Sequence, residues 1–115
     1  MGTTIDDQQL DSLFKALSDR TRRDIVARLS AGEVTVKELA EPYAMSMQAV
    51  SQHIRVLERS GLISQGRHRQ TRPCRLEPAA LEAAVSWIEE SRRAWSDRMD
   101  RLETHLARLQ ERENQ

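Results

Sequence analysis

The sequence predicts a mainly helical α+β fold with five helices and one two-stranded β-hairpin. Three observations support this prediction. Apolar residues recur at helical spacing in four segments before residue 60. Two short alternating runs then flank a polar, glycine-containing tip, which is the pattern of a hairpin. From Pro78 the chain has a helical pattern almost to its end. A length of 115 residues is that of one domain, so we expect a single domain over residues 1–115.

The first two helices are indicated by apolar spacing and by capping residues. Four apolar side chains at i, i+3, i+4 and i+7 predict an amphipathic helix over residues 7–17: Leu10, Leu13, Phe14 and Leu17. Either Ser18 or Asp19 can cap a second helix, which we expect to stop at Gly32.

A helix-turn-helix is predicted over about residues 35–60. Thr35 and Glu38 have the spacing of a capping box, which opens a short third helix that ends near Pro42. Ser46 then caps a fourth helix that runs to about residue 60, and Gly61 supplies the left-handed stop.

The hairpin and the last helix follow. Residues 62–65 and 74–76 alternate around the polar tip, and Pro73 is compatible with a strand at the edge of a sheet. Pro78 suits the first turn of a helix, and residues 78–112 give a rod of about 50 Å at about 1.5 Å per residue. Such a rod is longer than a domain of this size can cover.

The formal net charge of zero hides an uneven distribution. Residues 1–46 carry −2, residues 47–75 carry +5 and residues 76–115 carry −3. The basic segment contains the fourth helix and the hairpin, with six arginines against the single acidic residue Glu58. Arginines that neutralise phosphates supply most of the sequence-independent affinity of a protein for DNA. The segment therefore favours a nucleic-acid partner despite the neutral total.

The fourth helix has residues suited to reading bases. With Val50, Ile54 and Leu57 turned inward, its polar side chains must face outward. Glutamine pairs with adenine, arginine pairs with guanine, and small apolar groups contact the thymine methyl. We therefore predict DNA contacts from Gln48, Ala49, Ser51, Gln52 and Arg55. The hairpin tip suits phosphate or minor-groove contacts through Arg67, His68, Arg69 and Arg72.

Over about residues 10–80 the sequence resembles the ArsR-type winged-helix repressors. The resemblance rests on residues 13–23 (LFKALSDRTRR), 36–40 (VKELA), 49–57 (AVSQHIRVL), 61–63 (GLI) and 75–78 (RLEP). It implies a winged helix-turn-helix, in which the hairpin is the wing, and a dimeric repressor of a palindromic operator, often in its own promoter. It also implies that Ser46 belongs to the face that reads DNA. Met47 and Gln48 stand where relatives often have Arg-Pro, which affects the base preference that can be carried over.

The residues present bear on two kinds of regulation, by a metal ion and by oxidation. Many proteins of this kind bind a metal through a Cys-Val-Cys pair at the start of the third helix, where this chain has Thr35 and Lys37. The last helix has only one histidine, His105. We therefore expect the branch without the metal-binding cysteines, with no metal and no cofactor. Exposure of Cys74 beside Arg72 and Arg75 would make a redox switch. A core position shared with Leu76 would make the thiol inert, and we favour that reading.

The last helix is the predicted dimer seam. Its apolar positions alternate spacings of four and three from residue 81 to residue 109, interrupted only by Arg92, which is a coiled-coil stripe. We expect the first helix to join the same interface, which then contains Leu10, Leu13, Phe14, Leu17, Leu81, Val85, Ile88, Trp95, Met99, Leu102 and Leu106. Two-fold symmetry would place two recognition helices about 34 Å apart on DNA.

These observations predict a homodimeric, sequence-specific regulator of double-stranded DNA, acting as a repressor. No catalytic constellation is present, so we predict that the protein is not an enzyme. A metal- or redox-responsive repressor and a winged-helix protein-interaction module are the alternatives. The chain has no run of about 18 apolar residues and no signal-peptide pattern at residues 1–6, and its one cysteine fits a reducing compartment. We expect a cytoplasmic protein without membrane contact, and the sequence names no inducer.

Overall fold

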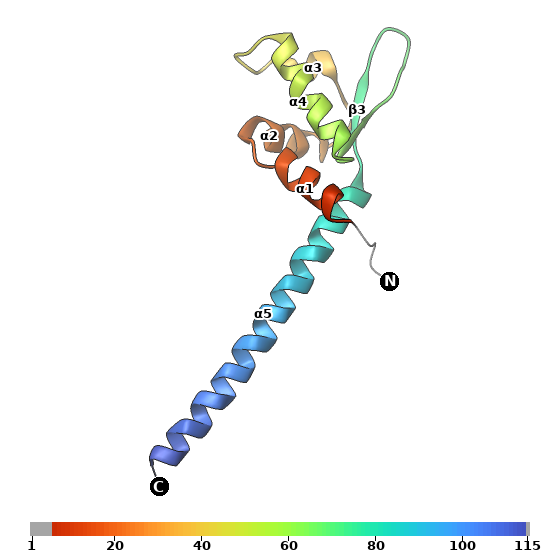
Figure 1. The fold of residues 1–115 in the computed structure, drawn as a ribbon. Helices are drawn as coiled ribbons and strands as arrows, with labels where there is room; N and C mark the ends of the chain where they lie inside the picture. Colours follow the sequence, from red (N-terminus) through yellow and green to blue (C-terminus); the bar gives the residue numbers. More distant parts are fainter. Residues whose placement is uncertain (1–5, 115) are drawn as a thin grey trace. The chain divides into compact units, whose positions relative to one another are not determined.

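A computed structural model describes residues 6–114, and the described part of the chain contains five helices and three short strands (Figure 1). In chain order these are α1 (Asp7–Ala16), α2 (Arg20–Leu29), β1 (Val34–Thr35), α3 (Val36–Ala40), α4 (Met47–Arg59), β2 (Ile63–Gln65), β3 (Pro73–Leu76) and α5 (Pro78–Glu113). The chain divides into two compact units between Ala84 and Val85, inside α5. Each unit is described by itself below.

The predicted starts of α2, α3 and α4 are confirmed by their caps. Asp19 caps α2, because its carboxylate accepts the Arg22 N–H at 3.0 Å. Thr35 and Glu38 form the reciprocal capping box of α3. Ser46 caps α4, and Gly61 follows this helix with a φ of 84°, the left-handed conformation that suits glycine. These boundaries therefore follow from side chains within a few residues of each helix end.

The small sheet corrects one sequence-based expectation. Its strand order is β1-β3-β2 with antiparallel pairing, so β3 is the central strand and the hairpin is extended to three strands. The prediction that Pro73 lies on an edge strand is wrong. Pro73 is tolerated because it is the first residue of β3, and its carbonyl accepts the Gly66 N–H at 2.8 Å. Alternation could not reveal β1, because that strand has only two residues.

The core of the first unit lies where the helices meet the sheet. Its largest fully buried side chains come from α1, α2, α3, α4 and the strand region: Leu13, Ile25, Leu39, Val50, Ile54, Leu57, Leu62 and Cys74. The start of α5 contributes Ala80 and Ala84. One continuous apolar cluster therefore fixes α4 and the sheet in a common frame.

The structure corrects the predicted role of Leu13. This side chain is 0% exposed within its own chain, so it has no surface left to offer a second subunit. Leu17 and Leu81 also pack partly against the core, and Leu10 is half-buried, whereas Phe14 is 38% exposed. The reason is that an amphipathic helix on a small domain first covers its own core with the same i, i+3, i+4, i+7 stripe.

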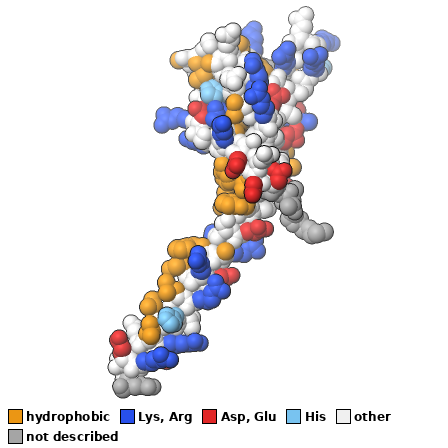
Figure 2. Space-filling view, viewed as in Figure 1, with side chains coloured by type: hydrophobic (Ala, Val, Ile, Leu, Met, Phe, Trp, Pro, Cys, Tyr) orange, Lys and Arg blue, Asp and Glu red, His pale blue; other side chains and the backbone are white. Residues whose placement is uncertain are grey.

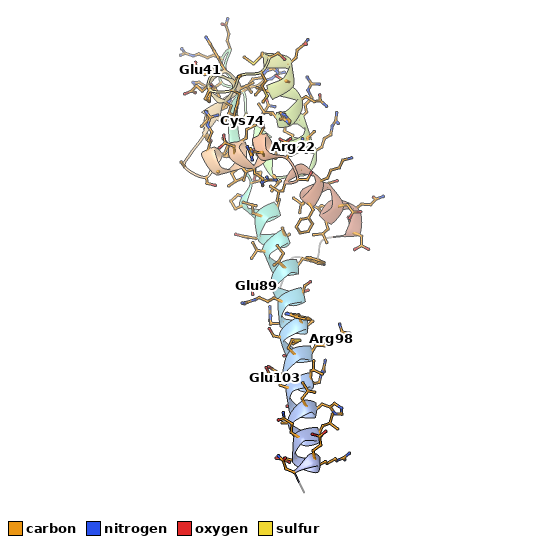
Figure 3. The ribbon with its side chains drawn as sticks, turned by 90° about the vertical axis from the view of Figure 1, so that its left-hand side faces the viewer. Arg22, Glu41, Cys74, Glu89, Arg98 and Glu103 are labelled. Atoms are coloured by element: carbon orange, nitrogen blue, oxygen red, sulfur yellow. The ribbon has the colours of Figure 1, made fainter. Side chains whose placement is uncertain are left out.

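In the second unit, α5 carries apolar side chains along one face, visible as a row in Figure 2. The large exposed ones there are Val85, Trp87, Ile88, Trp95, Leu102, Leu106 and Leu109, and Met99 is half-buried. Charged residues flank the row, with Arg98 on the opposite side of the helix from Glu89 and Glu103 (Figure 3). None of the described helices is long and apolar enough to cross a membrane.

Candidate nucleic-acid interface

The two faces of α4 differ sharply in burial. Val50, Ile54 and Leu57 are at most 1% exposed, as predicted from their spacing. Gln48, Gln52 and Arg55 are exposed, and the remaining predicted contacts of the helix, Ala49 and Ser51, are half-buried at its border. The helix is thus held by an apolar face while its polar face remains accessible. That arrangement is the one a recognition helix needs to enter the major groove.

Two of the predicted contact residues also have structural roles. The Ser46 hydroxyl oxygen accepts the Ala49 N–H at 3.1 Å, so Ser46 caps α4 while its own O–H remains able to donate. Arg55 Nη1 donates to Gln52 Oε1 at 3.3 Å, which links two outward side chains one turn apart. The polar face is therefore partly ordered before any ligand binds.

The wing, residues 62–76, presents its arginines at an ordered tip. His68 and Thr71 exchange backbone hydrogen bonds of 3.2 and 3.0 Å, and the Thr71 hydroxyl donates to the His68 carbonyl at 2.6 Å. Arg69, inside this turn, has a φ of 60°, the left-handed conformation that few non-glycine residues adopt. The four predicted wing contacts are all exposed: Arg67, His68, Arg69 and Arg72. The tip thus offers positive charge at the surface.

The wing is attached to α4 by side chains that sequence reasoning did not single out. Gln65 Nε2 donates to Glu58 Oε1 at 2.7 Å, joining β2 to α4. At the opposite edge of the sheet, the backbone N–H of Val36, the first residue of α3, donates to the carbonyl of Arg72, just before β3, at 3.1 Å. The one acidic residue of the basic segment, Glu58, is therefore engaged by an amide side chain. No local spacing could have revealed this pairing.

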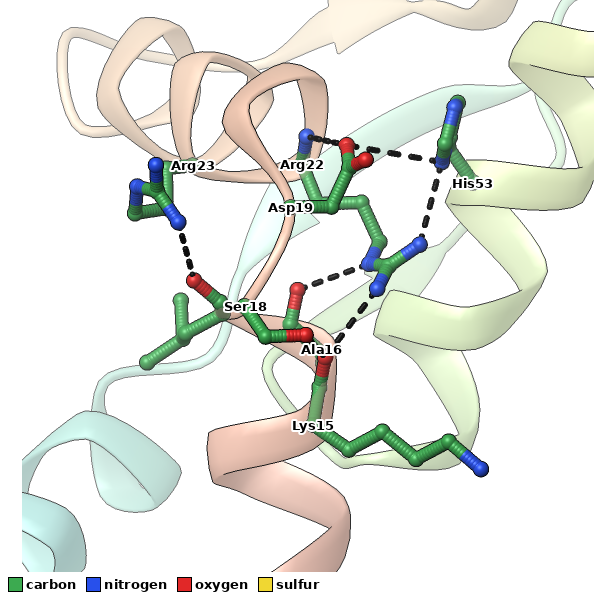
Figure 4. Close-up of polar contacts among 8 residues, drawn as sticks. Lys15, Ala16, Ser18, Asp19, Arg22, Arg23 and His53 are labelled. Atoms are coloured by element: carbon green, nitrogen blue, oxygen red, sulfur yellow. Dashed lines mark hydrogen bonds and ion pairs between the residues drawn. The ribbon is translucent and has the colours of Figure 1, made fainter.

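Arg22 ties α1 and α2 to α4 (Figure 4). Its guanidinium donates to the Ala16 carbonyl at 2.7 Å and to the Lys15 carbonyl at 3.0 Å, and Nη1 lies 3.2 Å from His53 Nδ1. The Arg22 backbone N–H, bonded to the Asp19 carboxylate, holds the pKa of Asp19 below its usual value. This network, also missed from the sequence, sets the end of α1 against the flank of the recognition helix.

The turn between α3 and α4 is supported by Tyr43 and Arg28. Tyr43 donates from its hydroxyl to the Asp24 carboxylate, and the Arg28 guanidinium stands 5.5 Å from the centre of the Tyr43 ring. Arg28 also donates to the Leu39 carbonyl at 2.8 Å. Desolvation raises the pKa of the Tyr43 phenol, as does its bond to Asp24. These contacts link α2 to α3 and to the turn that follows it.

Cys74 is 0% exposed, and burial raises the pKa of its thiol to about 11. Such a thiol remains protonated near neutral pH, and thiolate is the reactive form. This favours the inert reading of Cys74 over the redox switch. The Thr35 hydroxyl is occupied in the capping box. Across residues 6–114, no group of three or more His, Cys, Asp or Glu side chains is placed to hold a metal ion.

Comparisons with known proteins agree with this architecture. A family model described as a helix-turn-helix domain matches residues 17–65. The chain is 32% identical over 79 residues to the transcriptional repressor SdpR of Bacillus subtilis, covering 69% of this chain and 88% of that protein. It is 33% identical over 97 residues to the arsenical resistance operon repressor of Escherichia coli, covering 84% and 83%.

A solved structure of an ArsR family transcriptional regulator is also similar. It has a TM-score of 0.75 and 36% sequence identity, covering 84% of this chain and 97% of that chain. The amphipathic α4, the three-stranded sheet with its basic wing and these likenesses agree on one fold and one biochemical class. The chain belongs to the ArsR family of winged helix-turn-helix transcriptional regulators, which are DNA-binding proteins and not enzymes.

Proposed function

We propose that the protein is a cytoplasmic homodimeric repressor that binds an inverted-repeat operator in double-stranded DNA. The observation that carries this proposal is the exposed polar face of α4, which lies in the same compact unit as the basic wing. A recognition helix and a wing in one rigid frame can occupy neighbouring grooves of one duplex.

Within this proposal, the two groups of contacts have different tasks. The start of α4 reads base edges, because the N-terminal residues of a recognition helix lie deepest in the major groove. Gln48 and Gln52 are suited to adenine, and Ala49 and Ser51 to the thymine methyl. Ser46 and Arg55 add polar contacts along the same face. The wing holds the DNA through Arg67, His68, Arg69 and Arg72, mainly by neutralising phosphates.

Homodimerisation is supported by the apolar face of α5 in the second unit. Trp95 is 59% exposed, Leu102 is 47% exposed and Leu106 is 51% exposed. Burying each such side chain is worth about 1.5–3 kcal/mol, so a second copy that covers the row gains substantial free energy. Two-fold symmetry then pairs two recognition helices with the two halves of an inverted repeat.

Repression is supported by the relatives, since SdpR and the E. coli protein are both named as repressors. The DNA upstream of the protein's own coding region is the first target to examine. Footprinting should show a protected inverted repeat with half-sites about one helical turn apart. Sedimentation at micromolar concentration should show a dimer. Absence of protection on that DNA and on duplexes selected from a randomised pool would contradict the proposal, and so would a monomer.

A further inference from the structure

A small pocket lies between the recognition helix and the base of the wing. Its volume is about 90 Å³, and its lining residues are Val36, Ser51, Ile54, Arg55, Gln65 and Arg72. We call this pocket the α4–wing notch. Its wing residues are Gln65, the last residue of β2, and Arg72, the residue just before β3.

The notch is chemically suited to an anion. Arg55 and Arg72 bring two permanent positive charges, and none of the six lining residues is acidic. Within residues 6–114, neither guanidinium forms an ion pair with a carboxylate. Ser51 adds a hydroxyl donor, and Gln65 is held in place by its 2.7 Å bond to Glu58. Two guanidinium groups that have no carboxylate partner, beside neutral donors, bind phosphate oxygens well.

The way in which a recognition helix and a wing lie on DNA indicates which anion the notch would bind. When a recognition helix lies in the major groove and a wing reaches the adjacent minor groove, the sugar-phosphate strand that separates the two grooves must pass between them. The notch lies between α4 and the wing. Arg55 is also in the second half of α4 (Met47–Arg59), away from the N-terminal residues that reach base edges.

We propose that the α4–wing notch binds one backbone phosphate of the DNA, and that Arg55 and Arg72 hold this phosphate jointly. The proposal rests on the DNA-binding function argued above and deepens it. It assigns Arg55 to a phosphate, whereas residue type alone suggested a guanine. Recognition helix and wing thereby grip the same point of the DNA strand, which fixes the register of the bases under α4 without reading any base itself.

The test compares two duplexes and five proteins, the wild type and four variants. One duplex is selected by the wild-type protein from a randomised pool, and the other has an unrelated sequence and is measured at low salt. The variants are Arg55→Ala, Arg72→Ala and the double variant. Arg75→Ala is the matched control, since it removes the same charge from β3, while its guanidinium faces Glu33 at 3.9 Å and Glu77 at 3.7 Å.

A shared phosphate gives a distinctive result. Each single variant should lose about tenfold in affinity on both duplexes, because a phosphate contact is independent of sequence. The double variant should lose clearly less than the hundredfold product, since either arginine alone leaves the contact incomplete. Arg75→Ala should change binding little. A neutral methylphosphonate at one position of the selected duplex should abolish the difference between wild type and both single variants.

Three results would overturn the assignment. The first is a loss for Arg55→Ala on the selected duplex alone, which would indicate a base contact. The second is a double variant whose loss equals the product of the single losses, which would indicate two separate phosphates. The third is a loss for Arg75→Ala as large as that for the notch arginines, which would indicate general electrostatics. Failure to select any duplex would contradict sequence-specific binding, while the unrelated duplex would still test the notch.

Discussion

Arg22 Nη1 on α2 lies 3.2 Å from Nδ1 of His53 on α4. Because a guanidinium only donates hydrogen bonds, a hydrogen bond at this position requires His53 Nδ1 to be the acceptor. The same guanidinium donates to the carbonyls of Lys15 and Ala16 at the end of α1. One side chain thus joins three helices, one of which is α4, the proposed recognition helix.

Replacing Arg22 should therefore destabilise the first unit. Arg22→Ala removes donors from two backbone carbonyls and from His53, and we expect a loss of about 2 kcal/mol in the free energy of unfolding. Arg22→Lys should be destabilised almost as much, because a lysine ammonium cannot reproduce the planar, forked donors of the guanidinium. Arg20→Ala, at an exposed position of the same helix, is the control. Urea unfolding measures all three, and equal stability of Arg22→Ala and Arg20→Ala would refute the role given to Arg22.

Gln48 should contribute to sequence preference rather than to general DNA affinity. A bidentate contact to adenine is worth about 1–3 kcal/mol of discrimination, so Gln48→Ala should weaken binding to a selected duplex by about tenfold. Binding to an unrelated duplex should hardly change. Gln8→Ala, an exposed glutamine on α1, provides the control in the same titrations. Equal losses on both duplexes would show that Gln48 does not read a base.

The apolar face of α5 should control the oligomeric state. Leu102→Glu places a charge in the row, and loss of two leucine contacts per dimer should raise the dissociation constant by at least about a hundredfold. Thr104→Glu adds the same charge to the same helix outside the row and should leave the dimer intact. Sedimentation over a range of concentrations distinguishes the two variants. A dimer that tolerates Leu102→Glu would require a different interface.

Cys74 should be protected from thiol reagents in the folded protein. Its burial and its pKa of about 11 keep it neutral, so labelling near pH 8 should be slow until the protein unfolds. The raised pKa also has a consequence for stability. The contribution of this thiol to the free energy of unfolding is fully present below pH 9.0, which is the pKa of the thiol in the unfolded chain. It decreases as the pH rises toward 11, because in this range the thiol ionises readily only in the unfolded chain. Cys74→Val should remove that part of the alkaline loss. Rapid labelling of native protein would revive the redox alternative.

Much of this protein follows from the sequence alone, because the relevant rules act over a few neighbouring residues. Thr35, Glu38 and Ser46 predict helix starts by hydrogen bonds that span three residues, and the structure contains those bonds. The spacing of Val50, Ile54 and Leu57 predicts the buried face of α4 and hence its outward polar face. The charge pattern of residues 47–75 predicts which segment contacts DNA, and the structure places these residues on α4 and the wing.

Only the tertiary structure showed which part of the protein each apolar stripe or strand packs against. The stripe of α1 fits a core as well as an interface, and only packing showed that Leu13 is fully buried in its own chain. Strand β1 became visible only by pairing with β3, some 40 residues later. Arg55 and Arg72 are distant in sequence and line one notch only because the sheet packs on α4. The spacing of apolar residues determines which face of a helix or strand is apolar. Which element covers that face is determined only when all the elements pack together into one core.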